Sequence, residues 1–151
     1  MTTATLIPPK VKLTKNLING EWCDAATGKT FDTFNPATSQ AIAKVAESDQ
    51  ADVDQAVAAA RKAFDSGPWP KMSARARGKL MFKLADLIEA NADELAALEV
   101  LNNGKPISEV RAADIPLTAE TFRYFGGWAD KITGETIPVD QTFGNFSNAS
   151  I

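Results

Sequence analysis

The chain has 151 residues, which fits one domain or a part of a larger one, and 44% of them are hydrophobic. A formal net charge of −3, with no cluster of basic residues, excludes nucleic acid as an expected partner. One cysteine excludes an internal disulfide, and no apolar run reaches the roughly 18 residues of a membrane span. Because the N-terminal residues also lack the hydrophobic region of a signal peptide, we expect a cytoplasmic protein without a membrane partner.

The N-terminal part of the sequence predicts a flexible lead and then antiparallel strands. Residues 1–15 form the lead. Asn19-Gly20 favours the left-handed dihedrals of a tight turn, so residues 17–23 are predicted to form a hairpin. Polar and apolar residues alternate over residues 30–34, and residues 41–46 are rich in apolar types. We therefore expect a small antiparallel sheet with one solvated face.

The hydrophobic period becomes helical at residues 49–65. Acidic residues gather at the start of this segment and basic residues near its end, which complements the helix dipole. The apolar residues recur at the spacing of one helix face: Val53, Val57, Ala60 and Phe64. This face is expected to be buried.

The strongest helical signal lies in residues 73–104. Ser73 can cap the N-terminus, Asn91 marks a kink or a second cap, and Gly104 supplies left-handed geometry at the end. One face carries a long apolar stripe: Leu80, Leu84, Leu87, Ile88, Leu95, Leu98 and Leu101. A stripe of this length is expected to be buried against another element.

The C-terminal part predicts further helix and then irregular chain. A short helical turn is expected at residues 108–112, and Asp114 is expected to cap a helix that Gly126-Gly127 breaks or loosens. Residues 134–139 are expected to be extended. The last eleven residues, 141–151, are polar and patternless and are predicted to be disordered or poorly packed.

The sequence offers no catalytic constellation. Without histidine, it lacks the commonest general base, so no serine–histidine or cysteine–histidine pair can be built. Cys23 has no neighbouring cation and is interpreted as structural rather than reactive. Gly104-Lys105 is interpreted as a helix end, because Glu99 stands where a phosphate loop needs its first glycine. We assign no catalytic, cofactor-binding or metal-binding residue.

Two other clusters have structural interpretations. Asp52 and Asp54, like Asp93 and Glu94, lie at expected helix starts, where capping and the helix dipole explain them better than acid–base chemistry. The aromatic residues at positions 122–128 are interpreted as helical core rather than as a stacking surface for nucleic acid.

Five stretches follow one another in a specific order: LINGEW (17–22), FDTFNPAT (31–38), DVDQAVAAARKAFDSGPWPKMSARARGKLMFKLADLIEAN (52–91), LEVLNNGKP (98–106) and FRYFGGWADKITGETIPVD (122–140). Together they resemble the N-terminal segment of the NAD(P)-dependent aldehyde dehydrogenase superfamily over residues 16–140. Small departures are Asn102, where relatives usually carry aspartate, and Gly126, where alanine is common. The sequence leaves the pattern within residues 141–151, which form an unmatched tail.

The resemblance implies an α/β fold for the whole enzyme. It implies that this part of the enzyme is mainly α-helical, with an antiparallel hairpin region at its N-terminus and without the parallel nucleotide-binding sheet. The catalytic cysteine, glutamate and asparagine and the glycine-rich cofactor loop of the family lie beyond residue 151, and Cys23 does not match the motif of the nucleophile. Relatives often bind a monovalent cation near positions that resemble Thr33 and Asp114, which we do not assign as a site.

Two functions remain open. The first is a truncated aldehyde dehydrogenase segment that is inactive alone, whose whole enzyme oxidises aldehydes to carboxylic acids with NAD or NADP; no cofactor is expected for this chain by itself. The alternative is a free-standing helical interaction module. Few elements remain to cover the two apolar stripes, so we expect either self-association or binding of the missing C-terminal portion.

Overall fold

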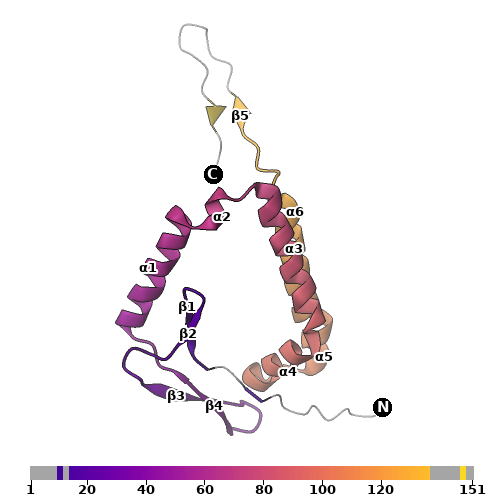
Figure 1. Cartoon of the computed structure of the whole chain (residues 1–151). Helices are drawn as coiled ribbons and strands as arrows, with labels where there is room; N and C mark the ends of the chain where they lie inside the picture. Colours follow the sequence, from indigo (N-terminus) through magenta and orange to yellow (C-terminus); the bar gives the residue numbers. More distant parts are fainter. Residues whose placement is uncertain (1–9, 12–13, 137–146, 149–151) are drawn as a thin grey trace.

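The computed structural model describes residues 10–11, 14–136 and 147–148, and the predictions for most of the N-terminal lead and of the tail lie outside this range. Two β-hairpins near the N-terminus precede the helices. Helix α1 (Gln50–Ser66) forms one side of the molecule, and α3 (Ala74–Ala90) and α6 (Ile115–Trp128) run side by side on the other (Figure 1). The short helix α2 (Pro68–Lys71) joins the two sides at one end, and the hairpins and α4 (Ala92–Asn103) lie at the other (Figure 1). The prediction of a mainly helical chain is confirmed.

Each hairpin forms where the sequence supplies turn chemistry. Strands β1 (Asn16–Ile18) and β2 (Glu21–Cys23) pair antiparallel around Asn19 and Gly20, whose φ angles of 53° and 82° are both left-handed. Strands β3 (Thr30–Phe34) and β4 (Ala41–Ala46) pair antiparallel with a register shift near Phe34. The strands are correctly predicted, but they form two separate two-stranded ladders rather than one sheet.

A third antiparallel pair lies near the C-terminus. Strand β5 (Glu135–Thr136) pairs with β6 (Ser147–Asn148), so these two pieces of chain projecting from the helical body are joined by backbone hydrogen bonds (Figure 1). The sequence predicts extended chain for the first piece and disordered or poorly packed chain for the second. Residues 147–148 are in a strand, so of these two alternatives disorder does not apply to them.

Helix α1 (Gln50–Ser66) begins with a reciprocal cap. The Asp49 carboxylate accepts a hydrogen bond from the Ala51 amide at 3.0 Å, and the Asp52 carboxylate accepts one from the Asp49 amide at 3.0 Å. Asp52 is only 3% exposed, and its second oxygen accepts a hydrogen bond from the Ala26 amide at 2.9 Å. The capping explanation of this acidic residue is confirmed, and the same side chain fastens the helix to the loop after β2.

The apolar face of α1 is exposed, so the prediction that it is buried is wrong. Val53, Val57 and Phe64 are between 50% and 71% exposed. Among the described elements α1 packs chiefly on β1 and on α2 (Pro68–Lys71), which are three and four residues long. These short elements cannot cover a stripe that runs over three turns of helix.

Residues 73–104 form two helices rather than one. The Ser73 hydroxyl caps α3 (Ala74–Ala90) by accepting a hydrogen bond from the Ala76 amide at 3.2 Å. The Asn91 side chain donates to the Leu87 carbonyl at 2.8 Å, and α4 (Ala92–Asn103) begins in a new direction (Figure 1). Gly104 ends α4 with a left-handed φ of 81°. The start, the kink and the end are thus confirmed.

The region after Pro106 is more continuous than predicted. The helical turn α5 (Ile107–Glu109), the π-helical turn η1 (Val110–Asp114) and α6 (Ile115–Trp128) follow one another without a break. Asp114 does not cap α6, because its backbone is itself helical. Gly126-Gly127 does not break α6 either. Gly126 instead lies close to the backbone of α3.

The contact between α3 and α6 uses small residues. Gly78, near the start of α3, lies against Gly126, near the end of α6, and a Cβ atom on Gly78 would lie 2.6 Å from the Gly126 carbonyl oxygen. Ala85 on α3 and Ala119 on α6 are fully buried. Because residues in a helix turn by about 100° each, Gly78 and Ala85 share one face of α3.

The leucines of α3 lie on the side opposite this contact. Leu80, Leu84 and Leu87 are between 41% and 51% exposed, so the prediction that this stripe is buried is also wrong. The close approach of the two backbones selects the glycine–alanine face for the interior and turns the leucines outward. No helix in the described part of the chain has the length and apolar character that a membrane span requires.

Candidate functional site

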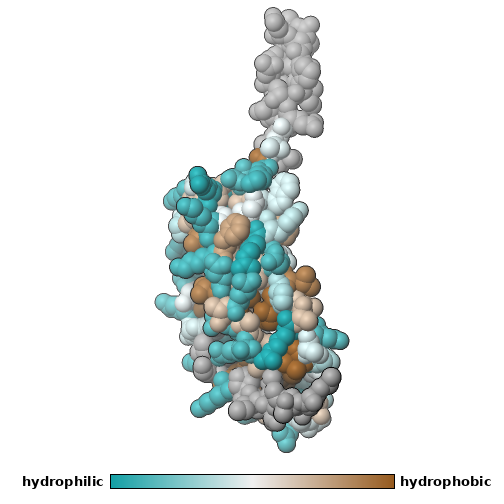
Figure 2. Space-filling model, turned by 90° about the vertical axis from the view of Figure 1, so that its right-hand side faces the viewer, coloured by the Kyte–Doolittle hydropathy of each residue, from teal (hydrophilic) through white to brown (hydrophobic). Residues whose placement is uncertain are grey.

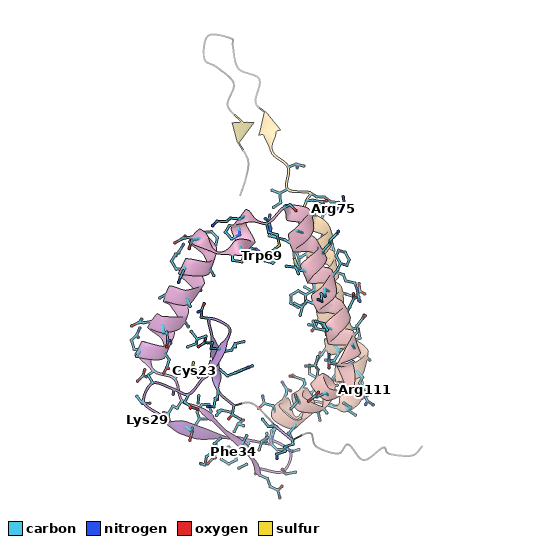
Figure 3. All side chains as sticks on the ribbon, viewed as in Figure 1. Cys23, Lys29, Phe34, Trp69, Arg75 and Arg111 are labelled. Carbon is cyan, nitrogen blue, oxygen red and sulfur yellow. The ribbon has the colours of Figure 1, made fainter. Side chains whose placement is uncertain are left out.

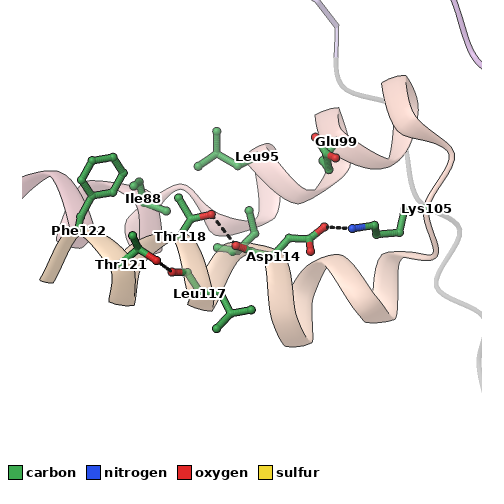
Figure 4. Close-up of a pocket in the computed structure, with 10 residues that line it drawn as sticks. Ile88, Leu95, Glu99, Lys105, Asp114, Leu117, Thr118, Thr121 and Phe122 are labelled. Carbon is green, nitrogen blue, oxygen red and sulfur yellow. Dashed lines mark hydrogen bonds and ion pairs between the residues drawn. The ribbon is translucent and has the colours of Figure 1, made fainter. Parts of the chain in front are cut away.

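A groove lies between α6 and the pair α3–α4 (Figure 4). It has a volume of about 800 Å³. Its apolar wall comes from all three helices: Ile88, Leu95, Ile115, Leu117 and Phe122. Its polar groups come from four elements or loops of the chain: Glu99, Lys105, Asp114, Thr118 and Thr121.

An ion pair closes one end of this groove. The Lys105 ammonium lies 2.7 Å from an Asp114 carboxylate oxygen, and both side chains are about one-third exposed. The hydrogen bond from Lys105 to Asp114 raises the pKa of this lysine, so the ammonium stays charged at neutral pH. Lys105 thus follows Gly104 at a helix end and is paired with a carboxylate.

The hydroxyl groups in the groove are already engaged. The Thr118 hydroxyl donates to the Asp114 carbonyl at 2.6 Å, and the Thr121 hydroxyl donates to the Leu117 carbonyl at 2.7 Å (Figure 4). With no histidine in the chain, neither threonine can form a serine–histidine type of pair. The groove therefore combines an apolar wall with polar groups that already have partners.

Cys23 lies far from this groove. It is on strand β2, whereas Arg111 lies in the turn η1 that also carries Asp114 (Figure 3). The thiol is half-buried and donates to the Asn16 carbonyl across the hairpin at 3.7 Å. These contacts support the structural interpretation of this residue.

Thr33 and Asp114 have different partners. The Thr33 hydroxyl donates to the Asn102 side-chain oxygen at 3.2 Å, which ties β3 to the end of α4. Asp114 is paired with Lys105 instead. Within the described ranges no group of three or more histidine, cysteine or acidic side chains could hold a metal ion.

The aromatic residues of α6 are not the core that the sequence suggests. Tyr124, Phe125 and Trp128 are between 50% and 60% exposed. The Tyr124 and Phe125 rings meet edge to face with centroids 5.2 Å apart, so they shield each other only in part. The interior contact of α6 is made instead by Ala119 and Gly126.

Sequence reasoning missed the strongest polar contact between α3 and α6. The Arg123 guanidinium donates to both oxygens of Glu89, at 2.6 and 2.5 Å, and to Asp86 at 2.9 Å. Glu120 lies 3.5 Å away on the same helix as Arg123. The acidic pair at a spacing of three on α3 is visible in the sequence, but its arginine stands 34 residues later and only the helix pairing brings them together.

This contact predicts a pH dependence. The Arg123 hydrogen bond holds the pKa of Glu89 below its usual value. A carboxyl with a lowered pKa in the folded state stabilises the protein above its unfolded pKa, and this stability is lost as pH falls through the folded pKa. We expect Glu89→Gln to lower the melting temperature at neutral pH and to have progressively less effect as the pH falls into the acidic range. In an Arg123→Met background this pH-dependent difference should disappear, and a constant difference at every pH would contradict the assignment.

Comparisons with known proteins agree on one family. The model of the aldehyde dehydrogenase family matches residues 22–149, which reaches into the segment that we expected to be unmatched. Benzaldehyde dehydrogenase, mitochondrial, from Antirrhinum majus is 54% identical over 133 residues, which are 88% of this chain and 25% of that protein. The putative aldehyde dehydrogenase DhaS of Bacillus subtilis is 53% identical over 89% of this chain and 27% of its own.

Solved structures give the same result. The NAD+ complex of aldehyde dehydrogenase from Bacillus cereus matches with a TM-score of 0.83 and 50% identity, and the match covers 86% of this chain and 26% of that one. The chain therefore spans about a quarter of the length of the relatives it matches.

Proposed function

Because this chain belongs to the aldehyde dehydrogenase family, we propose that it is the N-terminal structural segment of an enzyme that oxidises aldehydes to carboxylic acids with NAD, and that it is inactive alone. The observation that carries this proposal is its match, over nearly its whole length, to a quarter of such enzymes. NAD is favoured as the cofactor of the whole enzyme because solved relatives are NAD+ complexes.

The residues of this chain do not fit a dinucleotide. When bound, NAD+ accepts the hydride that leaves the aldehyde carbon. In the glycine–lysine loop after α4, Gly104 ends the helix and Lys105 is engaged by Asp114. We assign no residue of this chain to the cofactor. In the proposed function, the chain supplies the helices that form the groove.

The isolated chain should show no aldehyde-dependent reduction of NAD+ or NADP+. With no histidine, it has no cysteine–histidine pair, and its single cysteine bonds across a hairpin instead of standing in the groove. The measurement is the absorbance of reduced nicotinamide against a blank without protein, with a small set of aliphatic and aromatic aldehydes. Turnover above the blank that disappears in Cys23→Ser would contradict the proposal.

A second function has one observation in its favour. The exposed apolar face of α1 suits a free-standing helical module that binds another protein. The DNA that follows codon 151 distinguishes the two functions. Codons for the rest of an aldehyde dehydrogenase, in frame or shifted, support the enzyme segment, and their absence supports the module.

We also propose a cytoplasmic location. The single cysteine suits a reducing compartment. The relatives include proteins named as mitochondrial and as cytosolic, so cell fractionation is the appropriate test.

A further inference from the structure

The turn of the β1–β2 hairpin carries a chemically reactive dipeptide. On the face of the molecule with α3 and α6, hydrophobic residues reach the surface among hydrophilic ones (Figure 2). The hairpin lies away from that face, toward α1 (Figure 1). Its turn is Asn19-Gly20, and both residues are exposed. The same dipeptide occurs once more in the sequence, as Asn103-Gly104 at the end of α4, where both residues are also exposed. The two places share covalent chemistry and exposure and differ in their backbone contacts.

An asparagine that precedes a glycine can react with its own backbone. The glycine nitrogen attacks the side-chain carbonyl carbon of the asparagine, a nitrogen–carbon bond forms, and the side-chain nitrogen leaves as ammonia. Water then opens the resulting succinimide ring at either carbonyl, which gives aspartate or isoaspartate. The net reaction converts an amide and water into a carboxylate and ammonium. Glycine favours the attack because it has no Cβ atom to crowd its nitrogen.

The hairpin turn leaves this nitrogen accessible. The strand register pairs Ile18 with Glu21, so the two residues between them stand outside the ladder. A Cβ atom on Gly20 would meet nothing within 4 Å, so the space around this residue is open. The attack on the Asn19 side chain is therefore not blocked by a neighbouring element.

Opening this turn disturbs few contacts. Asn19 has a left-handed φ of 53°, and the attack requires rotation about the backbone bonds of the turn. The strands on either side have three residues each, and a two-stranded ladder of this size is only marginally stable by itself. The hydrogen bond from the Ser48 hydroxyl to the Asn16 side chain, at 3.0 Å, fastens the far end of the hairpin and is not involved in the rotation. The turn can reach the reactive conformation while the rest of the chain stays folded.

The second dipeptide is held on every side. The Gly104 amide donates to the Val100 carbonyl at 2.9 Å, so the nitrogen that would attack is engaged in the last turn of α4. A Cβ atom on Gly104 would lie 2.7 Å from the Pro36 side chain, so the loop after β3 lies against it. Asn102, before the dipeptide, accepts a hydrogen bond from β3 at 3.2 Å, and Lys105, after it, pairs with η1 at 2.7 Å. Reaction there requires the end of α4 to unfold.

We propose that Asn19 is a site of spontaneous deamidation in the folded protein, and that the structure directs this reaction to Asn19 and away from Asn103. The inference is independent of the proposed function, because the reaction needs only the turn and water. Deamidation adds a negative charge near Glu21, and isoaspartate also adds one carbon atom to the backbone. The lengthened backbone no longer fits the two-residue turn that joins Ile18 to Glu21, so this end of the hairpin opens.

The test compares the two asparagines within one sample. The full chain is incubated in its folded state at mildly alkaline pH and then digested at acidic pH, and mass spectrometry of the peptides measures aspartate and isoaspartate at each position. We expect Asn19 to convert at least about tenfold faster than Asn103, because the end of α4 has the higher free energy of local opening. In concentrated urea, where neither backbone is held, the two rates should be similar.

Three outcomes would overturn the proposal. The first is equal rates at Asn19 and Asn103 in the folded chain. The second is an unchanged Asn19 in the folded chain over a period in which the chain in urea converts. The third is conversion to aspartate without isoaspartate, which would indicate direct hydrolysis of the amide in place of ring formation.

A matched variant separates the added charge from the lengthened backbone. Asn19→Asp carries the charge of the aspartate product on an ordinary backbone, and aspartate followed by glycine also suits this turn. Hydrogen exchange at the amides of β1 and β2 should be unchanged in Asn19→Asp and at least about tenfold faster in the isoaspartate form, purified by chromatography. Equal exchange in the two proteins would overturn the expected opening of the hairpin.

Discussion

Gly78→Ala is expected to lower the free energy of unfolding by about 1–3 kcal/mol, because overpacking at a close helix contact forces the helices apart. The added Cβ would lie 2.6 Å from the Gly126 carbonyl oxygen, which belongs to the backbone of α6 and cannot turn aside. Alanine favours a helix over glycine by roughly 0.5–1 kcal/mol, and this gain is smaller than the expected clash. Urea denaturation at low protein concentration measures the difference through the shift of its midpoint.

Gly127→Ala is the matched control. Gly127 follows Gly126 in the same helix, and a Cβ atom there would meet nothing within 4 Å. The substitution should leave stability unchanged or raise it by about 0.5–1 kcal/mol, since only the helix preference acts. Equal losses at both glycines would show that alanine destabilises α3 and α6 for a reason other than their close approach at Gly78.

Asp52→Ala should cost about 1–3 kcal/mol, because it leaves two backbone amides without their acceptor. The buried carboxylate accepts hydrogen bonds from Asp49, at the start of α1, and from Ala26, in the loop after β2. Its loss therefore frays the helix and releases the hairpin at the same time. Thermal melting and hydrogen exchange at the Ala26 amide measure the two effects.

Asp54→Ala tests whether the effect belongs to the buried site. Asp54 lies two residues further along the same helix, but it is exposed, and among the described residues it accepts a hydrogen bond from the Gln50 side chain at 2.7 Å. We expect a change within about 0.5 kcal/mol. A loss as large as that of Asp52→Ala would mean that acidic charge near the helix dipole, rather than the two amide bonds, carries the stability.

The local structure was predictable because it depends on a few neighbouring residues. Asn19-Gly20 forms the predicted tight turn, Ser73 caps the start of α3, and Gly104 ends α4 in a left-handed conformation. Each feature follows from the chemistry of these residues. The kink at Asn91 was also visible, since a polar amide interrupts the leucine spacing and can bond the preceding turn. None of these features needs a distant partner.

The groove itself could not be predicted from the sequence, although composition limits the chemistry that the chain can offer. The absence of histidine and the single cysteine are enough, on composition alone, to exclude a nucleophile–base pair of the serine–histidine or cysteine–histidine kind. The groove itself joins residues from Ile88 to Phe122, and the Arg123 contact joins two helices. The sequence contains the residues of such sites, but it does not show which of them are in contact in the folded protein.

The sequence by itself determined the family, through ordered motifs, and the positions of the helices, through their hydrophobic period. Only the tertiary structure decided which face of each helix is buried. Helix α3 carries both a leucine face and a glycine–alanine face, and the second is the one inside, because it lets α6 approach within contact of the backbone. An apolar stripe predicts that a helix packs against a partner. Whether that partner is another part of the same chain depends on the packing of the whole molecule.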